Sequence, residues 1–289
     1  MQRTESFFES ADGLRLYYQQ WSATNPRAHL VIIHGLGEHS DCYDDFVHEL
    51  ADYDLRVSAW DLRGHGRSQG ARGAIADIYQ LTQDFEIFVN FVLKLNRRTE
   101  PLLLMGHSMG GLVLLKSLLG LREFQDCPLI LSSPFLGVAL PVPEWKRQAS
   151  GVISQVAPRF TLDAGLPPEL LTRDPERLRR YQRDPLRHQK ISAGLFESAQ
   201  SAIESVFFHA QAYTAPTLLI GSEADPVVDS REIRQLARHL KNPANELALL
   251  PGRLHEVFND LDREDAFARL KRFLETHASL RPKRRPYRI

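Results

Sequence analysis

Apolar positions along the chain alternate between short unbroken runs and longer stretches with helical spacing. Each unbroken run ends at a glycine or a polar residue, which is typical of strands buried on both faces of a sheet. These runs are "HLVIIHG", "LRVSAWDLRGHG", "LLLMG", "CPLILSSP", "APTLLIGSEADP" and "ELALLPG". Helical spacing follows most of them, at 41–53, 78–95, 112–121, 231–240 and 263–277. The alternation predicts an α/β fold whose mostly parallel sheet is covered by helices on both sides.

Two segments depart from this alternation. Near the N-terminus, "FFESADGLRLYYQQW" has apolar and aromatic residues on either side of Asp12-Gly13, which predicts an antiparallel hairpin. From 134 to 213 the sequence has no convincing buried strand and carries prolines and charged helical stretches such as "DPERLRRYQRD". We interpret 134–213 as a helical cap inserted into a core formed by 1–133 and 214–289.

The composition narrows the class of protein. Hydrophobic residues make up 43% of the chain and charged residues 25%, which is ordinary for a globular protein. Lys and Arg number 36, as do Asp and Glu, so charge gives no reason to expect a nucleic-acid partner. The chain has two cysteines, no signal-peptide pattern and no apolar run near the ~20 residues that span a bilayer. We therefore expect a cytoplasmic protein with reduced thiols. We interpret the basic "RPKRRPYRI" as a solvated end, with a weak contact to anionic surfaces as the alternative.

The stretch "PLLLMGHSMGGLVLL" matches the pattern G-x-S-x-G between a predicted strand and a predicted helix. A strand that turns abruptly into a helix strains its central residue, and glycines at Gly106 and Gly110 avoid Cβ clashes there. The turn would project the hydroxyl of Ser108 above the edge of the sheet. We therefore assign Ser108 as a nucleophile; the alternative is a tight turn with an incidental serine.

A serine hydroxyl needs a base to remove its proton, and eleven histidines are available. His255 follows the strand "ELALLPG" and precedes the last helix, which places it in a loop at the edge of the sheet. His107 adjoins Ser108, but its side chain should point away from the site. The other histidines considered are expected on helices or in the cap: His188, His209, His239 and His277. We assign the base to His255; otherwise it is a satisfied loop histidine.

The imidazole in turn needs a carboxylate that holds its tautomer. The segment "LLIGSEADPVVD" places Glu223, Asp225 and Asp229 just beyond a strand. Asp225 precedes a proline that stiffens the turn, whereas Asp229 suits the N-cap of the next helix. We assign Asp225, which gives the chain order serine, acid, histidine that α/β-hydrolases have. Asp229 is the alternative.

Acyl transfer also needs amide donors that already point at the developing oxyanion. The amide of Met109, directly after the nucleophile, is one candidate. The loop "IIHGLGEHS" follows an early strand and offers the amide of Leu36 as the second. The alternative for this loop is a glycine turn that leads into the following helix.

Several motifs together resemble the monoacylglycerol lipase and lysophospholipase group of α/β-hydrolases. They are "HGLGEHS", "DLRGHGRSQGARG", "GHSMGG", "RYQRDPL", "GSEADPVVD" and "GRLHEVFND". The resemblance implies an eight-stranded, mostly parallel sheet with a cap inserted after the sixth strand. It also implies a triad of Ser108, Asp225 and His255, with Leu36 and Met109 in the oxyanion hole.

The expected activity is therefore that of a serine ester hydrolase that uses neither cofactor nor metal. It would act through an acyl-enzyme on a small, lipid-like acyl ester, and its cap would touch membrane surfaces transiently. The alternatives are a serine aminopeptidase or thioesterase on the same fold, a minor cofactor-free peroxidase activity, or a binding protein without catalysis. An aminopeptidase would need cap acids to hold an amino terminus, for which the candidates are Glu169, Glu176, Glu197 and Glu204.

The motif "DLRGHGRSQG" raises a separate question, because arginines among glycines can bind phosphate. We interpret it instead as a structural loop near the edge of the sheet. Our hypothesis is that Arg63 pairs with Glu38 and braces the oxyanion loop.

Overall fold

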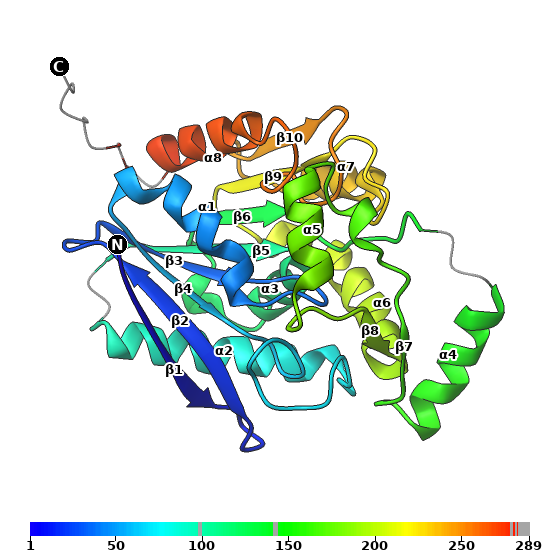
Figure 1. The fold of residues 1–289 in the computed structure, drawn as a ribbon. Coiled ribbons are helices and arrows are strands. Elements are labelled where there is room, and N and C mark those ends of the chain that lie inside the picture. The colour runs from blue at the N-terminus through cyan, green and yellow to red at the C-terminus, as the bar shows by residue number, and fades with distance from the viewer. Residues whose placement is uncertain (98–99, 141–143, 278–279, 281, 283–289) are drawn as a thin grey trace.

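The computed structural model describes residues 1–97, 100–140, 144–277, 280 and 282, so the basic C-terminal tail lies largely outside the described residues. Its centre is an eight-stranded sheet in the order β1-β2-β4-β3-β5-β6-β9-β10 (Figure 1). The strands are β1 (Gln2–Glu9), β2 (Arg15–Ser22), β3 (Ala28–Ile33), β4 (Leu55–Trp60), β5 (Leu102–His107), β6 (Leu129–Ser132), β9 (Thr217–Ser222) and β10 (Glu246–Leu250). β1 pairs antiparallel with β2, as the hairpin pattern predicts, and β2 pairs antiparallel with β4. All remaining neighbours pair in parallel, which confirms the predicted mostly parallel sheet.

The central strands are continuously apolar because both of their faces are covered. The helices are α1 (Asp44–Glu49), α2 (Ile78–Leu95), α3 (Met109–Leu118), α4 (Glu144–Val156), α5 (Pro175–Arg183), α6 (Ala193–Phe208), α7 (Ser230–His239) and α8 (Glu264–His277). In β3, Leu30 and Ile32 join a cluster with residues of α1 and α8, while Val31 and Ile33 join a cluster with residues of α2, α3, α6 and α7. Successive side chains of a strand point to opposite faces, so a strand between two helical layers has no polar side.

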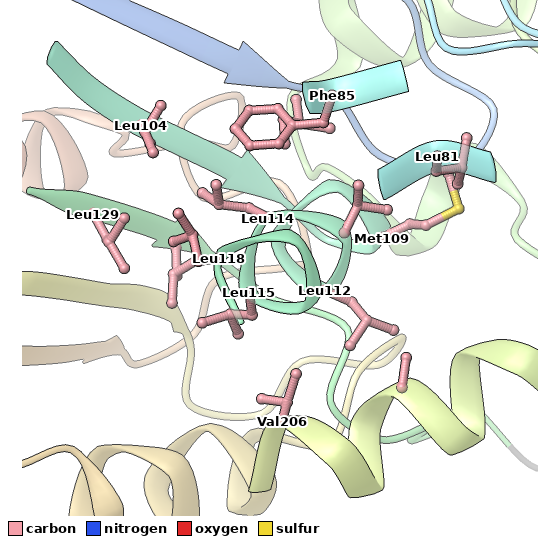
Figure 2. Packing of buried hydrophobic residues seen from close by; sticks show 14 of the residues in the cluster. Leu81, Phe85, Leu104, Met109, Leu112, Leu114, Leu115, Leu118, Leu129 and Val206 are labelled. Carbon is pink, nitrogen blue, oxygen red and sulfur yellow. The ribbon is translucent and has the colours of Figure 1, made fainter. Parts of the chain in front are cut away.

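Helix α3 is central to the larger of these clusters. Figure 2 shows it packed between the strands that carry Leu104 and Leu129 on one side and α6, with Val206, on the other. Leu112, Leu114 and Leu115 of α3 are fully buried. This packing fixes the helix whose first residue follows Ser108.

The expected elements differ from the observed ones in two places near the site. The helix predicted at 41–53 is broken into α1 flanked by the 3-10 turns η1 (Ser40–Tyr43) and η2 (Ala51–Tyr53), because the chain reverses at Asp54 in a left-handed conformation to enter β4. The helix predicted at 112–121 begins three residues earlier, at Met109, since two glycines weaken the helical pattern in its first turn.

The interpreted cap segment forms α4, α5, α6 and a two-stranded antiparallel sheet of β7 (Thr161–Asp163) and β8 (Lys190–Ser192). It also contains the 3-10 turns η4 (Pro168–Leu170) and η5 (Ala210–Ala212), while η3 (Arg122–Phe124) precedes β6. Helix α4 projects away from the body of the molecule, and α6 lies in the layer with α2 and α3 (Figure 1). The chain from α5 to β8 passes over the carboxyl ends of β3 and β5, where the N–H of His188 donates to the Gly37 carbonyl at 3.2 Å.

Candidate active site

Ser108 lies at a sharp turn between β5 and α3. Its backbone has φ +50° and ψ −119°, a conformation that L-residues adopt at a cost. A Cβ at Gly106 would lie 2.5 Å from the carbonyl oxygen of Gly110, and one at Gly110 would lie 2.2 Å from that of Ile33. The turn is tied to the next strand because the Ser108 N–H donates to the Ser132 carbonyl at 2.9 Å. The glycines of the sequence motif are thus required by backbone that runs directly against them.

Asp225 and His255 form a buried hydrogen-bonded pair. The distance from Nδ1 of His255 to Oδ2 of Asp225 is 2.8 Å, and Oδ1 of Asp225 accepts the N–H groups of Val227 and Val228 at 2.8 and 3.1 Å. Burial would raise the pKa of Asp225, but the attraction of His255 and these hydrogen bonds hold it below its usual value. Burial likewise would lower the pKa of His255, and Asp225 reverses this and raises it.

The pairing fixes the role of each ring nitrogen. With Nδ1 as the donor to Asp225, Nε2 of His255 is the nitrogen that can accept a proton. The carbonyl oxygen of His255 accepts the Ser133 hydroxyl at 2.8 Å, which anchors the loop to the end of β6. Ser108 and His255 line the same cavity, of about 350 Å³.

Asp229, the alternative acid, caps α7 by accepting the N–H of Arg231 at 2.9 Å. The expectation that the His107 side chain points away from the site is wrong. His107 lines the same cavity as Ser108, its ring centroid lies 4.9 Å from that of His255, and its Nδ1 lies 3.1 Å from the carbonyl oxygen of Ser132. The remaining histidines contact nearby backbone or an acid of the surface: His188 with Gly64, His209 with Ser205, His239 with Gln235 and His277 with Glu246.

The loop after β3 lies against the serine turn. A Cβ at Gly35 would be 3.3 Å from Cβ of Ser108, so Gly35 lies directly against the serine turn. The Gly35 carbonyl lies 2.8 Å from Nδ1 of His34, whose Nε2 accepts the N–H of Leu62 at 2.9 Å. Because the C=O and N–H of a trans peptide point in opposite directions, this contact turns the Leu36 N–H away from His34. The second candidate donor is the N–H of Met109. Because Met109 is the first residue of α3, its N–H has no acceptor within the helix.

The hypothesis that Arg63 pairs with Glu38 is wrong. The Arg63 guanidinium binds Asp84 at 2.7 Å and Asp12 at 2.8 Å instead, which ties α2 to the turn of the β1–β2 hairpin. Glu38 accepts the N–H of Gly35 at 2.8 Å, so Glu38 does brace the loop that is predicted to supply an oxyanion donor, but it does so through the backbone. The guanidinium nearest to Glu38 comes from Arg187 of the cap, at 3.9 Å.

Two cavities of different character meet at Ser108 and Leu36. The first, of about 350 Å³, has polar walls that include Tyr181, Arg187 and Glu256. The second, of about 320 Å³, is mostly apolar and is lined by residues of α3, the cap and the loop after β6, among them Met109, Phe135, Val138, Leu140, Leu162 and Phe196. The arrangement can hold an ester with its acyl chain on one side of the serine and its alcohol on the other.

The polar residues of the first cavity that sequence reasoning missed include Tyr181, Arg187 and Glu256. Glu256 directly follows His255, which could have drawn notice. Arg187 has no such signal, because nothing in the pattern separates it from the other arginines of the cap.

Within the described parts of the chain, no group of three or more His, Cys, Asp or Glu side chains is arranged to hold a metal ion. The described helices also include none that is both long and apolar enough to cross a bilayer.

Known proteins share this architecture. The family model described as serine aminopeptidase, S33, matches residues 24–262. A monoacylglycerol lipase of Mycolicibacterium smegmatis is 30% identical over 91% of this chain and 93% of its own length, and a phospholipase of Bacillus subtilis is 28% identical over 89% and 98%. The crystal structure of Paleococcus ferrophilus monoacylglycerol lipase matches with a TM-score of 0.76 at 29% identity, over 93% of this chain and 96% of that one. The chain therefore belongs to the serine aminopeptidase S33 family of α/β-hydrolases and is a relative of monoacylglycerol lipases.

Proposed function

We propose that this protein is a serine hydrolase that cleaves carboxylic esters of monoacyl lipids, with Ser108, Asp225 and His255 as its catalytic triad. One observation carries the proposal: His255, hydrogen-bonded to Asp225, and the strained Ser108 border one cavity, and Ser108 also borders the apolar cavity beside it. The named lipase and phospholipase relatives support the ester as the bond that is cleaved.

The reaction proceeds in two steps. Nε2 of His255 takes the proton of the Ser108 hydroxyl as its oxygen attacks the ester carbonyl, and the same proton then goes to the leaving alcohol. Asp225 holds the ring and stabilises the imidazolium. The amides of Leu36 and Met109 donate to the oxyanion. Water, activated by His255, then releases the fatty acid and restores the serine.

The cap, proposed as residues 134–213, would bring the enzyme to its lipid. Val152 and Val156 on α4 are 66% and 79% exposed, and Phe160 just beyond them is 52% exposed. The next strand, β7, contributes Leu162 to the apolar cavity. An exposed apolar surface beside the acyl chamber favours transient contact with a membrane or micelle.

We place the enzyme in the cytoplasm, where the absence of a disulfide at Cys42 and Cys127 is the normal state.

An aminopeptidase is the main alternative, because the matching family carries that description. The four acids proposed to hold a peptide amino terminus, Glu169, Glu176, Glu197 and Glu204, line neither cavity that Ser108 borders. Glu256 does line the polar cavity, but its carboxylate already accepts a hydrogen bond from Arg187. The geometry therefore favours an ester over a peptide substrate.

Two measurements test the proposal. A fluorophosphonate probe should label the wild type and fail to label Ser108→Ala; folded wild type that resists the probe would indicate a binding protein. Hydrolysis is then compared across p-nitrophenyl esters, monoacylglycerols, lysophospholipids and aminoacyl amides. Faster cleavage of aminoacyl amides than of any ester would replace this proposal with the peptidase.

A further inference from the structure

A buried group of charges joins the cap to both catalytic loops. Arg187, between α5 and β8, donates to a carboxylate oxygen of Glu256 at 3.0 Å, and its guanidinium lies 3.9 Å from a carboxylate oxygen of Glu38. The three side chains, here called the Arg187 cluster, are 10%, 3% and 4% exposed in that order. Ion pairs buried to this extent lose hydration that their attraction only partly offsets. Stability alone therefore does not account for the cluster.

The guanidinium is held in one orientation by its surroundings. It lies 3.9 Å from the centroid of the Tyr181 ring and 3.4 Å from the sulfur of Cys42. Glu256 is fixed as well, since the second oxygen of its carboxylate accepts the Tyr181 hydroxyl at 2.5 Å and the Asn259 amide at 2.8 Å. Tyr181 and Arg187 belong to the proposed cap, whereas Cys42, Glu38, Glu256 and Asn259 belong to the core. The cluster therefore joins the cap to the core.

Each carboxylate of the cluster leads to one part of the catalytic machinery. Glu38 accepts the N–H of Gly35 and the hydroxyl of Tyr43 at 2.8 and 3.1 Å, so it holds the loop that offers the Leu36 amide. Glu256 directly follows His255 in the chain. Arg187 thus reaches the oxyanion donor and the general base through one residue each.

We propose that Arg187 is a positioning residue of the esterase reaction: it lies between Glu38 and Glu256 and sets the orientation of the oxyanion loop and the charge around His255. This inference rests on the proposed ester hydrolysis. With the cap seated, the cluster carries two carboxylates and one guanidinium. Without the guanidinium, two carboxylates face the catalytic histidine uncompensated.

The charges around His255 define the expected effect. Asp225, Glu256 and Glu38 all stabilise its imidazolium form, while burial lowers the pKa of the adjacent His107. Burial would raise the pKa of Glu256, but the Arg187 guanidinium holds it at about 2, so Glu256 is an anion at every working pH. Loss of the Arg187 charge should therefore raise the pKa of His255, and loss of the Glu256 charge should lower it.

The test is the pH profile of kcat/KM for p-nitrophenyl butyrate and for a monoacylglycerol. In Arg187→Met we expect the acid limb to move up by at least about 0.5 pH units, with kcat at neutral pH reduced about tenfold through the displaced Leu36 amide. Glu256→Gln should move the limb down. The double variant, which restores the net charge of the cluster, should return the limb toward the wild-type position. Arg183→Met, an exposed arginine at the end of α5, is the matched control and should behave as wild type.

A purely structural role for Arg187 gives different results. Activity would then fall equally at every pH, with the limb unmoved in both single variants, and that outcome overturns the inference. If Arg187→Met does not fold, the test uses Arg187→Lys together with Glu256→Gln. Arg187→Lys should leave the acid limb of the pH profile at its wild-type position while kcat falls. Absence of fluorophosphonate labelling in the wild type would refute the proposed function instead, so the two failures are distinguishable.

Discussion

At the scale of single residues, the site depends on which ring nitrogen of each histidine carries the proton. Nε2 of His34 accepts the Leu62 N–H, so Nδ1 holds the proton and donates to the Gly35 carbonyl. Burial lowers the pKa of His34 to about 3, and the neutral ring therefore persists over the working range. His255 also donates from Nδ1, but to Asp225, which leaves Nε2 for the proposed transfer of a proton. The same tautomer thus supports the backbone in one residue and suits the proposed general base in the other.

We expect His34→Ala to reduce kcat by about 10- to 100-fold, since the Leu36 amide loses the contact that directs it. KM should change little, because the contact is made to the backbone and not to the substrate. The loss should be the same from pH 6 to pH 9, as His34 does not titrate there. Steady-state kinetics on a p-nitrophenyl ester check this, and a rise in KM at constant kcat would contradict it.

The raised pKa of His255 predicts the direction of the pH dependence. Catalysis needs the neutral ring, so kcat/KM should fall as the pH drops through a midpoint above the ordinary value of 6.5. Asp225→Asn removes the main group that raises this pKa. The midpoint should then fall below that of the wild type, and kcat should drop by roughly 10⁴-fold as the tautomer is lost. An unchanged midpoint would show that Asp225 does not face the titrating base.

At the scale of elements, the serine turn is a close packing of backbone on backbone. Gly110, the second residue of α3, lies against the end of β3, where a Cβ would meet the Ile33 carbonyl oxygen at 2.2 Å. Gly120, beyond the other end of the same helix, is open: its nearest contact would be 3.7 Å, from the Ser117 carbonyl oxygen. The two glycines thus differ in their surroundings and give a matched pair.

Gly110→Ala should lower the free energy of unfolding by about 2 kcal/mol or more, because the helix must shift away from β3. Gly120→Ala should stay within about 0.5 kcal/mol of the wild type. Urea denaturation measures both. Equal effects in the two variants would mean that the close approach at Gly110 is relieved elsewhere.

The elements that the sequence predicts well are those with a strong local pattern. The helix at 78–95 coincides with α2, because Ile78, Leu81, Phe85 and Phe88 recur at helical spacing along one buried stripe. The glycines of the serine turn are also local, and so are readable. The partners of Arg63 and Glu38 are not, since their contacts join segments far apart in the chain. Charge and spacing alone therefore could not lead to Arg187.

At the scale of the whole molecule, the cap combines two unlike surfaces. Toward the core it presents the polar groups Tyr181 and Arg187, and away from it α4 and the chain just beyond carry Val152, Val156 and Phe160 into solvent. Figure 1 shows α4 as the most projecting helix on this side. We therefore expect the proposed cap to contact a lipid surface through α4 while its polar groups stay in contact with the core.

We expect the double variant Val156→Ser and Phe160→Ser to bind phospholipid vesicles several-fold more weakly. It should also hydrolyse micellar monoacylglycerol more slowly, while p-nitrophenyl butyrate in solution is cleaved at the wild-type rate. Phe208→Ser is the matched control, because Phe208 is 84% exposed but lies at the far end of α6. Co-sedimentation and both assays decide the matter; equal losses on both substrates would indicate a damaged fold instead.

The meeting of two cavities at Ser108 has a consequence for the acyl-enzyme of the proposed mechanism. In that mechanism the fatty chain stays in one cavity after the first half-reaction, and the alcohol leaves the other. We expect a small alcohol that enters the vacated cavity to compete with water for the acyl group. In concentrated glycerol or another small alcohol, the protein should thus transfer part of its acyl groups to that alcohol and build esters as well as cleave them.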